Sequence, residues 1–433
     1  MELRKLFIRG LFGHFNHTIK FKEGNVTILT APNGYGKTVC LKVIDSIFNR
    51  KLSFLCDLQF TAIELETSEG VLTIEKDMEE SPNKITLGHG DLEKSHEYHR
   101  DYTLSKKTTI HAIDTSIPFL HRIGPREWED IRTDDIYSFD EVIETFSEYL
   151  PDEFTAQKYP EWFVVFTDSL KAHFIQDQRL IQRKGSADRN RRKSFIDTIE
   201  KYADELSDLI RQSGFRSSHV SQQLDTTFPE RLLRNDKYFV PMEAENLKQE
   251  LQKLQGIRSE LSAFDLLSSA QHLPALHVLD EIKPEDKKVL TLYVQDTKEK
   301  LSSYDGIYKK IELFSRILNS KRLSFKRIKI NSSRGFQFET ERGRPLELTQ
   351  LSSGEQHQVV LLYELIFKTE KNVLVLIDEP EISLHVAWQK EFLKDLKEII
   401  NIQSMPVVVA THSPQIIDGN WDLTVDLEEG GLA

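Results

Sequence analysis

The sequence predicts an α/β protein in which helices flank a mixed sheet and a helical insertion separates two halves of the chain. Short apolar runs rich in β-branched residues, at 26–30, 373–377 and 407–410, are typical of strands buried on both faces of a parallel sheet. Alternating apolar and polar segments toward both ends of the chain predict antiparallel hairpins. Between them, residues 194–318 carry apolar side chains at helical spacing, which predicts the insertion.

The composition excludes several classes of protein. The 433 residues suffice for two or more domains, and a net charge of -12 disfavours a protein that coats nucleic acid. No run of about 18 apolar residues is present to span a membrane, and the N-terminus lacks the apolar core of a signal peptide. Cys40 and Cys56 are the only cysteines, too few for a disulfide framework. We therefore expect a cytoplasmic protein without a membrane partner.

The first part of the chain predicts two hairpins and a mixed region. Residues 3–8 and 17–21 alternate like paired strands, and residues 60–75 predict a second hairpin. Residues 77–110 predict a loop or an edge hairpin, and residues 118–163 predict short helical pieces.

The last part of the chain returns to strands. Residues 323–350 predict a hairpin, and residues 380–400 predict an amphipathic helix between the buried strands 373–377 and 407–410. We expect a solvated acidic tail that contains Asp422, Asp426, Glu428 and Glu429.

A glycine-rich loop at 31–38, Ala-Pro-Asn-Gly-Tyr-Gly-Lys-Thr, lies between a buried strand and a helical pattern. Gly34 and Gly36 allow backbone amides to surround phosphate oxygens, Lys37 places a cation on the β- and γ-phosphates, and Thr38 reaches magnesium. The alternative is a glycine-rich turn without a ligand, but the strand, loop and helix context favours nucleotide binding. The predicted ATP-binding residues of this loop are Asn33, Gly34, Tyr35, Gly36, Lys37, Thr38 and Val39.

Two carboxylates follow the buried strand 373–377. The carboxyl ends of parallel strands are where ligands bind in such sheets. A charged loop start would explain Asp378 and Glu379, but they also fit a site in which Asp378 holds magnesium and Glu379 orients an attacking water. Upstream, a helix start with small residues predicts a second phosphate-binding element, although an ordinary N-cap has the same pattern. Its residues are Ser352, Ser353, Gly354 and Glu355.

Two further polar positions lie at predicted strand ends. His412 follows the strand 407–410, beside the Asp378 strand, and could touch a γ-phosphate. Gln178, or alternatively Gln176, follows a predicted strand from 171 and could approach the magnesium and the attacking water. Either glutamine could instead be a solvated loop residue.

A basic segment interrupts this acidic chain at 179–193. Five arginines and two lysines oppose one aspartate there. A solvated loop is the simple explanation, and binding of DNA phosphates or of an acidic protein is the functional one. The candidate anion-binding residues are Arg183, Lys184, Arg189, Arg191, Arg192 and Lys193.

Four motifs together carry a family resemblance. APNGYGKT resembles a Walker A loop, LSSGE an ABC-type signature, VLVLIDEPE a Walker B strand with its catalytic glutamate, and ATHSP a histidine switch. Their order, with 313 residues between Thr38 and Ser352, is similar to that of the RecF, SMC and OLD-like ABC ATPases. The DEPEISLH and FIQDQRL segments resemble the ATPases of anti-phage defence systems such as PARIS and Septu. Ala31 replaces the usual first glycine, and no Toprim-type nuclease domain is expected.

The resemblance implies an ABC-type P-loop ATPase head that uses ATP and Mg²⁺. Residues 1–178 and 321–433 would form its halves, with the basic loop and helical insertion at 179–320. It also implies that the signature of one copy completes the ATP site of another, in a homodimer or higher even-numbered oligomer. The head association would regulate a separately encoded nuclease or toxin in antiviral defence; alternatively, the chain would bind DNA as a repair or DNA-organising ATPase.

Overall fold

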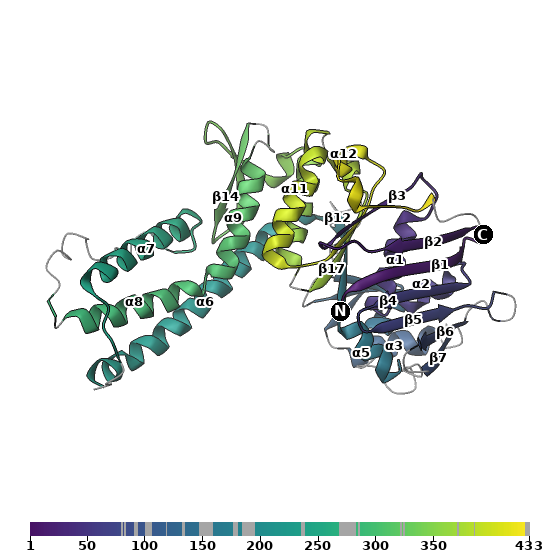
Figure 1. Cartoon of the computed structure of the whole chain (residues 1–433), viewed down its shortest axis with the longest axis horizontal. Coiled ribbons are helices and arrows are strands. Elements are labelled where there is room, and N and C mark those ends of the chain that lie inside the picture. The colour runs from purple at the N-terminus through teal and green to yellow at the C-terminus, as the bar shows by residue number, and fades with distance from the viewer. Residues whose placement is uncertain are drawn as a thin grey trace. The chain divides into compact units, whose positions relative to one another are not determined.

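The computed structural model describes most of the chain, namely residues 1–78, 81, 84–90, 94–99, 106–117, 119–131, 135–146, 159–175, 181–183, 195–234, 239–267, 283–284, 286–320, 323, 325–369, 372–384 and 386–428. The chain divides into two compact units (Figure 1). The first unit comprises Met1–Ile196 and Phe367–Ala433, and the second comprises Asp197–Ile366. The boundary after Ile366 lies inside the last of the three predicted parts, 1–178, 179–320 and 321–433. These two units do not correspond to the three parts, and the three-part division stays a prediction.

A five-stranded parallel sheet organises the first unit. Its order is β11-β17-β18-β3-β19, and every neighbouring pair within it is parallel. The apolar runs form its buried central strands because both faces of the sheet are covered. The strands are β3 (Val26–Thr30), β11 (Lys171–Ile175), β17 (Val373–Asp378), β18 (Val407–Ala410) and β19 (Thr424–Asp426).

A six-stranded antiparallel sheet covers one side of the same unit, with order β2-β1-β4-β5-β6-β7. Both predicted hairpins belong to it, and the edge-hairpin alternative for residues 77–110 is confirmed by β6 and β7. The strands are β1 (Leu3–Leu11), β2 (Phe15–Lys20), β4 (Ala62–Thr67), β5 (Gly70–Glu75), β6 (Lys84–His89) and β7 (Lys94–His99).

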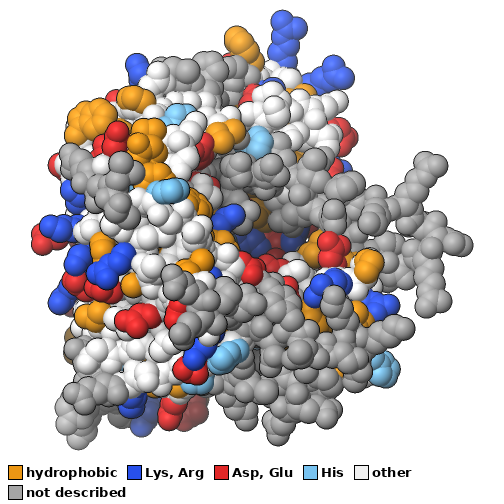
Figure 2. Space-filling view, turned by 90° about the vertical axis from the view of Figure 1, so that its right-hand side faces the viewer, with side chains coloured by type: hydrophobic (Ala, Val, Ile, Leu, Met, Phe, Trp, Pro, Cys, Tyr) orange, Lys and Arg blue, Asp and Glu red, His pale blue; other side chains and the backbone are white. Residues whose placement is uncertain are grey.

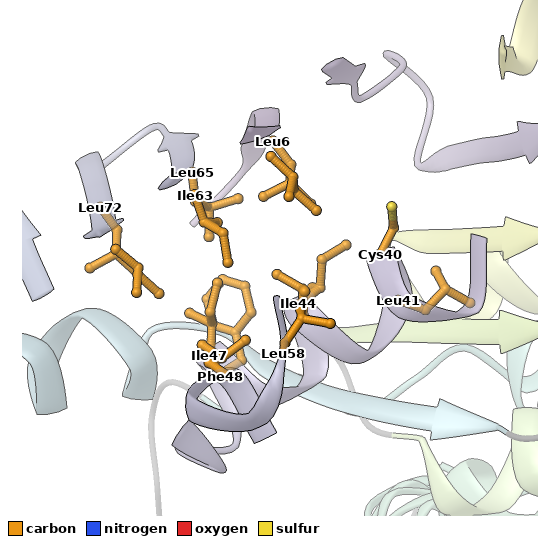
Figure 3. Close-up of a cluster of buried hydrophobic side chains, with 14 of the residues drawn as sticks. Leu6, Cys40, Leu41, Ile44, Ile47, Phe48, Leu58, Ile63, Leu65 and Leu72 are labelled. Atoms are coloured by element: carbon orange, nitrogen blue, oxygen red, sulfur yellow. The ribbon is translucent and has the colours of Figure 1, made fainter. Parts of the chain in front are cut away.

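Helix α1 (Lys37–Phe48) joins the two sheets through the main core. Its side chains Ile44 and Ile47 lie toward Leu6 and Leu65 of the antiparallel sheet (Figure 3), and the same buried cluster extends to strands β17 and β18. Because α1 begins directly after the glycine-rich loop, this packing fixes where that loop ends. The other helices and short turns of this unit are α2 (Leu52–Asp57), α5 (Glu161–Asp168), η6 (Pro380–Ser383), α11 (Val386–Gln403), α12 (Pro414–Ile417) and η7 (Trp421–Leu423).

The segment predicted as short helical pieces, 118–163, contains three strands, so that prediction was wrong in part. Strands β8 (Leu120–Gly124), β9 (Glu127–Asp130) and β10 (Asp135–Ser138) form a separate sheet. Each strand has four or five residues, too few for alternation to be distinguished from helical spacing. The sheet packs with α3 (Lys106–Ser116) and α4 (Phe139–Thr145) around Trp128.

The acidic tail is also more ordered than the sequence predicts. Strand β19 pairs with β3, and the amide of the buried Leu427 donates to the carbonyl of Thr30 over 3.0 Å. Asp422, Asp426 and Glu428 are exposed as expected, whereas Glu429 lies outside the described residues. The tail is therefore an edge strand with a solvated acidic side.

The second unit contains five α-helices, among its described residues, and a three-stranded antiparallel sheet. Helix α6 packs against α8, β15 and α10, and α9 packs against β14. Aromatic rings of Tyr202, Phe314, Phe336 and Tyr363 form its centre. The elements are α6 (Thr198–Leu233), α7 (Ala244–Ala263), α8 (Asp286–Ser302), α9 (Asp305–Asn319), β14 (Lys326–Asn331), β15 (Gly335–Thr340), β16 (Pro345–Leu346), η4 (Leu348–Gln350) and α10 (Ser353–Tyr363), with the π-helix η5 (Glu364–Lys368) reaching the boundary.

The basic segment 179–193 contains the short strand β12 (Ile181–Arg183), which pairs with β13 (Phe195–Asp197) directly after the segment. Arg183 ends β12, and the rest of the candidate anion-binding residues lie outside the described residues. Among the helices that are described, none has the length and apolar character needed to cross a membrane.

Candidate nucleotide site at the ends of the parallel strands

Three strand ends of the first unit meet at one edge of the parallel sheet. Asp378 pairs with Ala410, and Ala410 pairs with Leu29. Beyond the strands, the amide of Glu379 donates to the carbonyl of Ala410, and the amide of Thr411 donates to the carbonyl of Leu29. The predicted neighbourhood of the Asp378 strand and the His412 strand is confirmed. This edge is where an α/β sheet binds its ligand.

The glycine-rich loop has the backbone that its sequence predicts. Gly34 and Gly36 have φ angles of 90° and 85°, in the left-handed region that side chains other than that of glycine rarely adopt. A Cβ atom on Gly36 would also lie 3.0 Å from the Leu11 side chain. Lys37 is 5% exposed, and its ammonium donates to the carbonyl of Ala31 over 2.9 Å. The loop thus holds a buried cation against the carbonyls of Ala31 and Pro32.

A buried histidine on strand β2 hydrogen-bonds to this loop. The Nε2 atom of His17 lies 2.8 Å from the carbonyl oxygen of Tyr35, and the His17 ring stacks on Phe15. Burial lowers the pKa of His17, although its backbone hydrogen bonds to Tyr35 and Leu427 oppose the shift. The neutral ring therefore donates Nε2–H to the loop carbonyl. Sequence inspection gave His17 no role because it has no ligand-like spacing.

Hydroxyl and carboxylate groups suited to magnesium lie together at the start of α1. The Thr38 hydroxyl donates to the Asp378 carboxylate over 3.1 Å, although the two residues are 340 positions apart. Magnesium prefers such oxygen ligands and binds through few protein groups plus phosphates and waters. The residues present therefore fit ATP with magnesium: Thr38 and Asp378 would hold the ion, and Lys37 would face the phosphates.

Glu379 occupies a strained position at the same edge. Its φ of 40° and ψ of 59° place a non-glycine residue in the left-handed region, which costs of order 1 kcal/mol and persists where neighbours over-determine the backbone. Its carboxylate lies 4.0 Å from the Lys37 ammonium and 3.6 Å from Nδ1 of His412. His412 is 47% exposed, so its ring borders the site without being enclosed.

Besides His17, the structure adds Glu381, a second residue to which the sequence assigned no role. It is 7% exposed, and its Oε1 atom lies 3.1 Å from Nδ1 of His412. Its only sequence signal is the second glutamate of DEPE, two positions after Glu379. Burying a carboxylate costs free energy unless the carboxylate is paired. The burial of Glu381 therefore points to a role more strongly than its place in the motif does.

The helix start at Ser352 lies in the second unit and is built as predicted. Helix α10 begins at Ser353, and Ser352 caps it by accepting from the Glu355 amide. The Glu355 carboxylate accepts from the Ser352 amide over 2.8 Å and from the Lys326 ammonium over 2.7 Å. Ser352 and Ser353 are exposed. The carboxylate therefore fixes the shape of a helix N-terminus whose first two serines are exposed.

The Lys326 ammonium should make the stability of this helix start depend on pH. Burial by itself would raise the pKa of Glu355, but hydrogen bonds from Lys326 and Ser352 outweigh it, so the pKa lies below its ordinary 4.5. The resulting stabilisation is present above pH 4.5 and is lost as the pH falls through the lowered pKa. We expect Lys326→Met to lower the free energy of unfolding by about 1–2 kcal/mol at pH 7, with a smaller loss below pH 4.

Urea denaturation at both pH values measures this effect. The matched control is Lys329→Met on the same strand, since Lys329 pairs with Glu339 over 2.7 Å but is mostly exposed; an exposed pair contributes about 0–1 kcal/mol. Equal losses for the two variants at both pH values would contradict the assignment.

The remaining predicted site residues are not described by the structure. Gln176 and Gln178 follow β11 directly and lie outside the described residues, so a glutamine beside the magnesium stays a prediction. The same holds for most of the basic segment, that is, Lys184, Arg189, Arg191, Arg192 and Lys193.

Comparison with known proteins agrees with this geometry. Residues 1–417 match the family model AAA_15, described as AAA ATPase domain. The chain is 31% identical to protein ea59 of Escherichia phage lambda over 70 residues, which are 16% of this chain. The match spans only 13% of the length of ea59.

Solved SMC head domains are similar at low identity. An Smc head domain from Pyrococcus furiosus, with an extended coiled coil and bound to the C-terminal domain of ScpA, is 13% identical with a TM-score of 0.38. That comparison covers 100% of this chain and 95% of the other. The SMC head domain from Thermotoga maritima is 12% identical with a TM-score of 0.33, covering 96% of this chain and 92% of that one.

The family model spans nearly the whole chain, and the matched residues include the loop and the strand ends described above. The chain therefore belongs to the AAA_15 family of AAA ATPase domains and is an ATPase.

Proposed function

We propose that ATP joins two copies of this chain, because the site of one copy is completed by the Ser352 helix start of the other. The observation that supports this most directly is the state of that helix start. Ser352 and Ser353 are exposed, while Glu355 is tied back to Lys326 and the cap. An exposed helix N-terminus can bind an anion. A γ-phosphate held by a second subunit is the anion that this proposal assigns to it.

The residues of the first unit have distinct roles in this proposal. Lys37 neutralises the β- and γ-phosphates, which its buried position beside the loop carbonyls allows. Glu379 orients and deprotonates the attacking water, and His412 donates a hydrogen bond to the γ-phosphate as charge develops there. When bound between Thr38 and Asp378, magnesium supplies further positive charge to the phosphate oxygens. Loss of the γ-phosphate removes the shared anion, so hydrolysis releases the two copies.

The association would serve to hold or release a separately encoded effector, such as a nuclease or toxin, in antiviral defence. The segments DEPEISLH and FIQDQRL support this role only through their resemblance to the ATPases of anti-phage defence systems. DNA binding through the basic segment is the alternative, in the manner of a repair or DNA-organising ATPase. On the face shown in Figure 2, Lys and Arg side chains of the described residues are interspersed with Asp and Glu rather than gathered in one patch.

The Glu379→Gln protein should sediment as a monomer without ATP and as a dimer or higher even-numbered oligomer with ATP and magnesium. Bound ATP is then not consumed, so the joined state accumulates. Sedimentation velocity at micromolar protein measures the change. Adding Ser353→Arg should abolish the association, because a bulky cation occupies the helix start. Ser218→Arg, at an exposed serine on α6, is the matched control and should leave it intact.

Equal sedimentation with and without ATP would overturn the proposal. A DNA duplex included in the same runs separates the two roles. Salt-dependent co-sedimentation of the duplex that disappears when Arg189, Arg191 and Arg192 are neutralised would favour the DNA alternative.

A further inference from the structure

The buried carboxylate of Glu381 connects the loop after β17 to the loop after β18. Its Oε1 atom accepts from the Thr411 hydroxyl over 2.5 Å and from the His412 amide over 2.9 Å. The same atom lies 3.1 Å from Nδ1 of His412. One oxygen therefore holds both the backbone and the ring of a residue at the nucleotide edge.

A second side chain clamps the same two loops from helix α11. The Gln389 amide donates to the carbonyls of Glu381 and Leu384, over 3.3 Å and 3.0 Å. Its carbonyl accepts from the Ser413 hydroxyl over 2.8 Å. Gln389 thus holds both the backbone of Glu381 and the side chain of Ser413, the residue after His412. This restricts how far the Glu381 carboxylate can turn away from His412.

We propose that Glu381 is a positioning residue, which fixes the tautomer and ring orientation of His412 for its contact with the γ-phosphate. The Oε1 atom accepts from the Thr411 hydroxyl and from the His412 amide, so it is an acceptor and the facing Nδ1 carries a proton. The Nε2 atom is then the ring nitrogen left for the ligand. The arrangement follows the logic of a catalytic triad, in which a buried carboxylate orients an imidazole that does the chemistry. This inference rests on the role of His412 in the proposed function.

Metal binding is the competing explanation of the same cluster. One ligand atom each from Glu379, Glu381 and His412 lies within 4.8 Å of the others. However, the Glu381 Oε1 atom already faces three donors, and a cation would have to displace them. The other oxygen, Oε2, is buried with no hydrogen-bond partner among the described residues. Replacing this oxygen by the amide nitrogen of a glutamine therefore breaks no hydrogen bond. Glu381→Gln is for this reason the conservative variant in the test.

Glu381→Ala should lower kcat about 10- to 100-fold, a typical loss for a residue that orients a site group, with KM for ATP within about twofold. Glu381→Gln should keep kcat within about threefold, since its amide oxygen accepts the same three hydrogen bonds. Thr411→Val removes one of the three donors but leaves the ring contact, so its kcat should stay near that of the parent protein. Steady-state ATPase assays at saturating magnesium measure all three variants.

Two measurements separate positioning from a general structural role. In a His412→Ala background, Glu381→Ala should cause no further loss of kcat beyond about twofold, because the residue it orients is gone. In the protein without nucleotide, ¹⁵N spectra of labelled histidine should show the Nδ1–H tautomer for His412, and Glu381→Ala should shift it toward Nε2–H. The His412 signal is assigned from its loss in His412→Gln.

Parent-like kcat in Glu381→Ala combined with slow turnover in His412→Ala would overturn the inference, as would additive losses in the double variant. Parent-like turnover in His412→Ala would instead refute the role of His412 in the proposed function, and the ¹⁵N spectra would still decide what Glu381 does to the ring. Failure of Glu381→Gln together with tight Zn²⁺ or Mn²⁺ binding to the parent would establish the metal explanation.

Discussion

The Glu379→Gln protein will hydrolyse ATP about 100- to 10,000-fold more slowly than the parent chain, the range that loss of a general base produces. The carboxylate lies 4.0 Å from the Lys37 ammonium, beside the loop that would hold the γ-phosphate. An amide of the same shape cannot accept the proton of the attacking water. ATP affinity should stay within about threefold, because Lys37, Thr38 and Asp378 are unchanged. Phosphate release under single-turnover conditions and equilibrium binding of ATP measure the two quantities.

The same substitution at an exposed glutamate supplies the control. Glu23 lies in the connection after β2, and Glu23→Gln should leave both turnover and binding unchanged. Turnover within fivefold of the parent in Glu379→Gln would remove Glu379 from its assigned role. A loss of ATP binding together with turnover would show that the left-handed backbone at this position, rather than the carboxylate chemistry, is what the substitution disturbs.

The parts of the site that the sequence predicted well are those in which short-range pattern and fold agree. A buried strand followed by Gly34, Gly36 and Lys37 leaves few alternatives, since the positive φ angles and the helix start are local properties. The partnership of Thr38 with Asp378 was also foreseen, because parallel strands bring their carboxyl ends to one edge.

The parts that the sequence did not predict depend on contacts between distant segments. Glu381 meets Thr411 and His412 across 30 positions or more, and nothing local marks its carboxylate as buried. His17 looks like any strand residue until β2 brings it against the carbonyl of Tyr35. The strand at Thr424–Asp426 has three residues and owes its pairing to β3 rather than to its own propensity. Such features require the tertiary structure.

Gly335→Ala should destabilise the second unit by about 3–5 kcal/mol, among the larger effects of a single substitution. Gly335 begins β15 at a φ of 67°, and a Cβ atom there would lie 1.8 Å from the carbonyl oxygen of Ala203 and 2.9 Å from the amide of Ser207. Both atoms belong to the backbone of α6, which can give way only by moving the helix.

Helix α6 and the β14–β15 hairpin must separate to accommodate the methyl group, and the consequence reaches the helix start at Ser352. Strand β14 carries Lys326, whose ammonium binds the Glu355 carboxylate. Urea denaturation should therefore show a large loss for Gly335→Ala, and hydrogen exchange should rise in both α6 and α10. Gly343→Ala is the matched control, because Gly343 has a similar φ of 77° but no atom within 4 Å of the added carbon. Gly343→Ala should lower the free energy of unfolding only by the backbone strain, about 1–2 kcal/mol. Equal losses for the two variants would show that the close approach of Gly335 to Ala203 does not limit the packing.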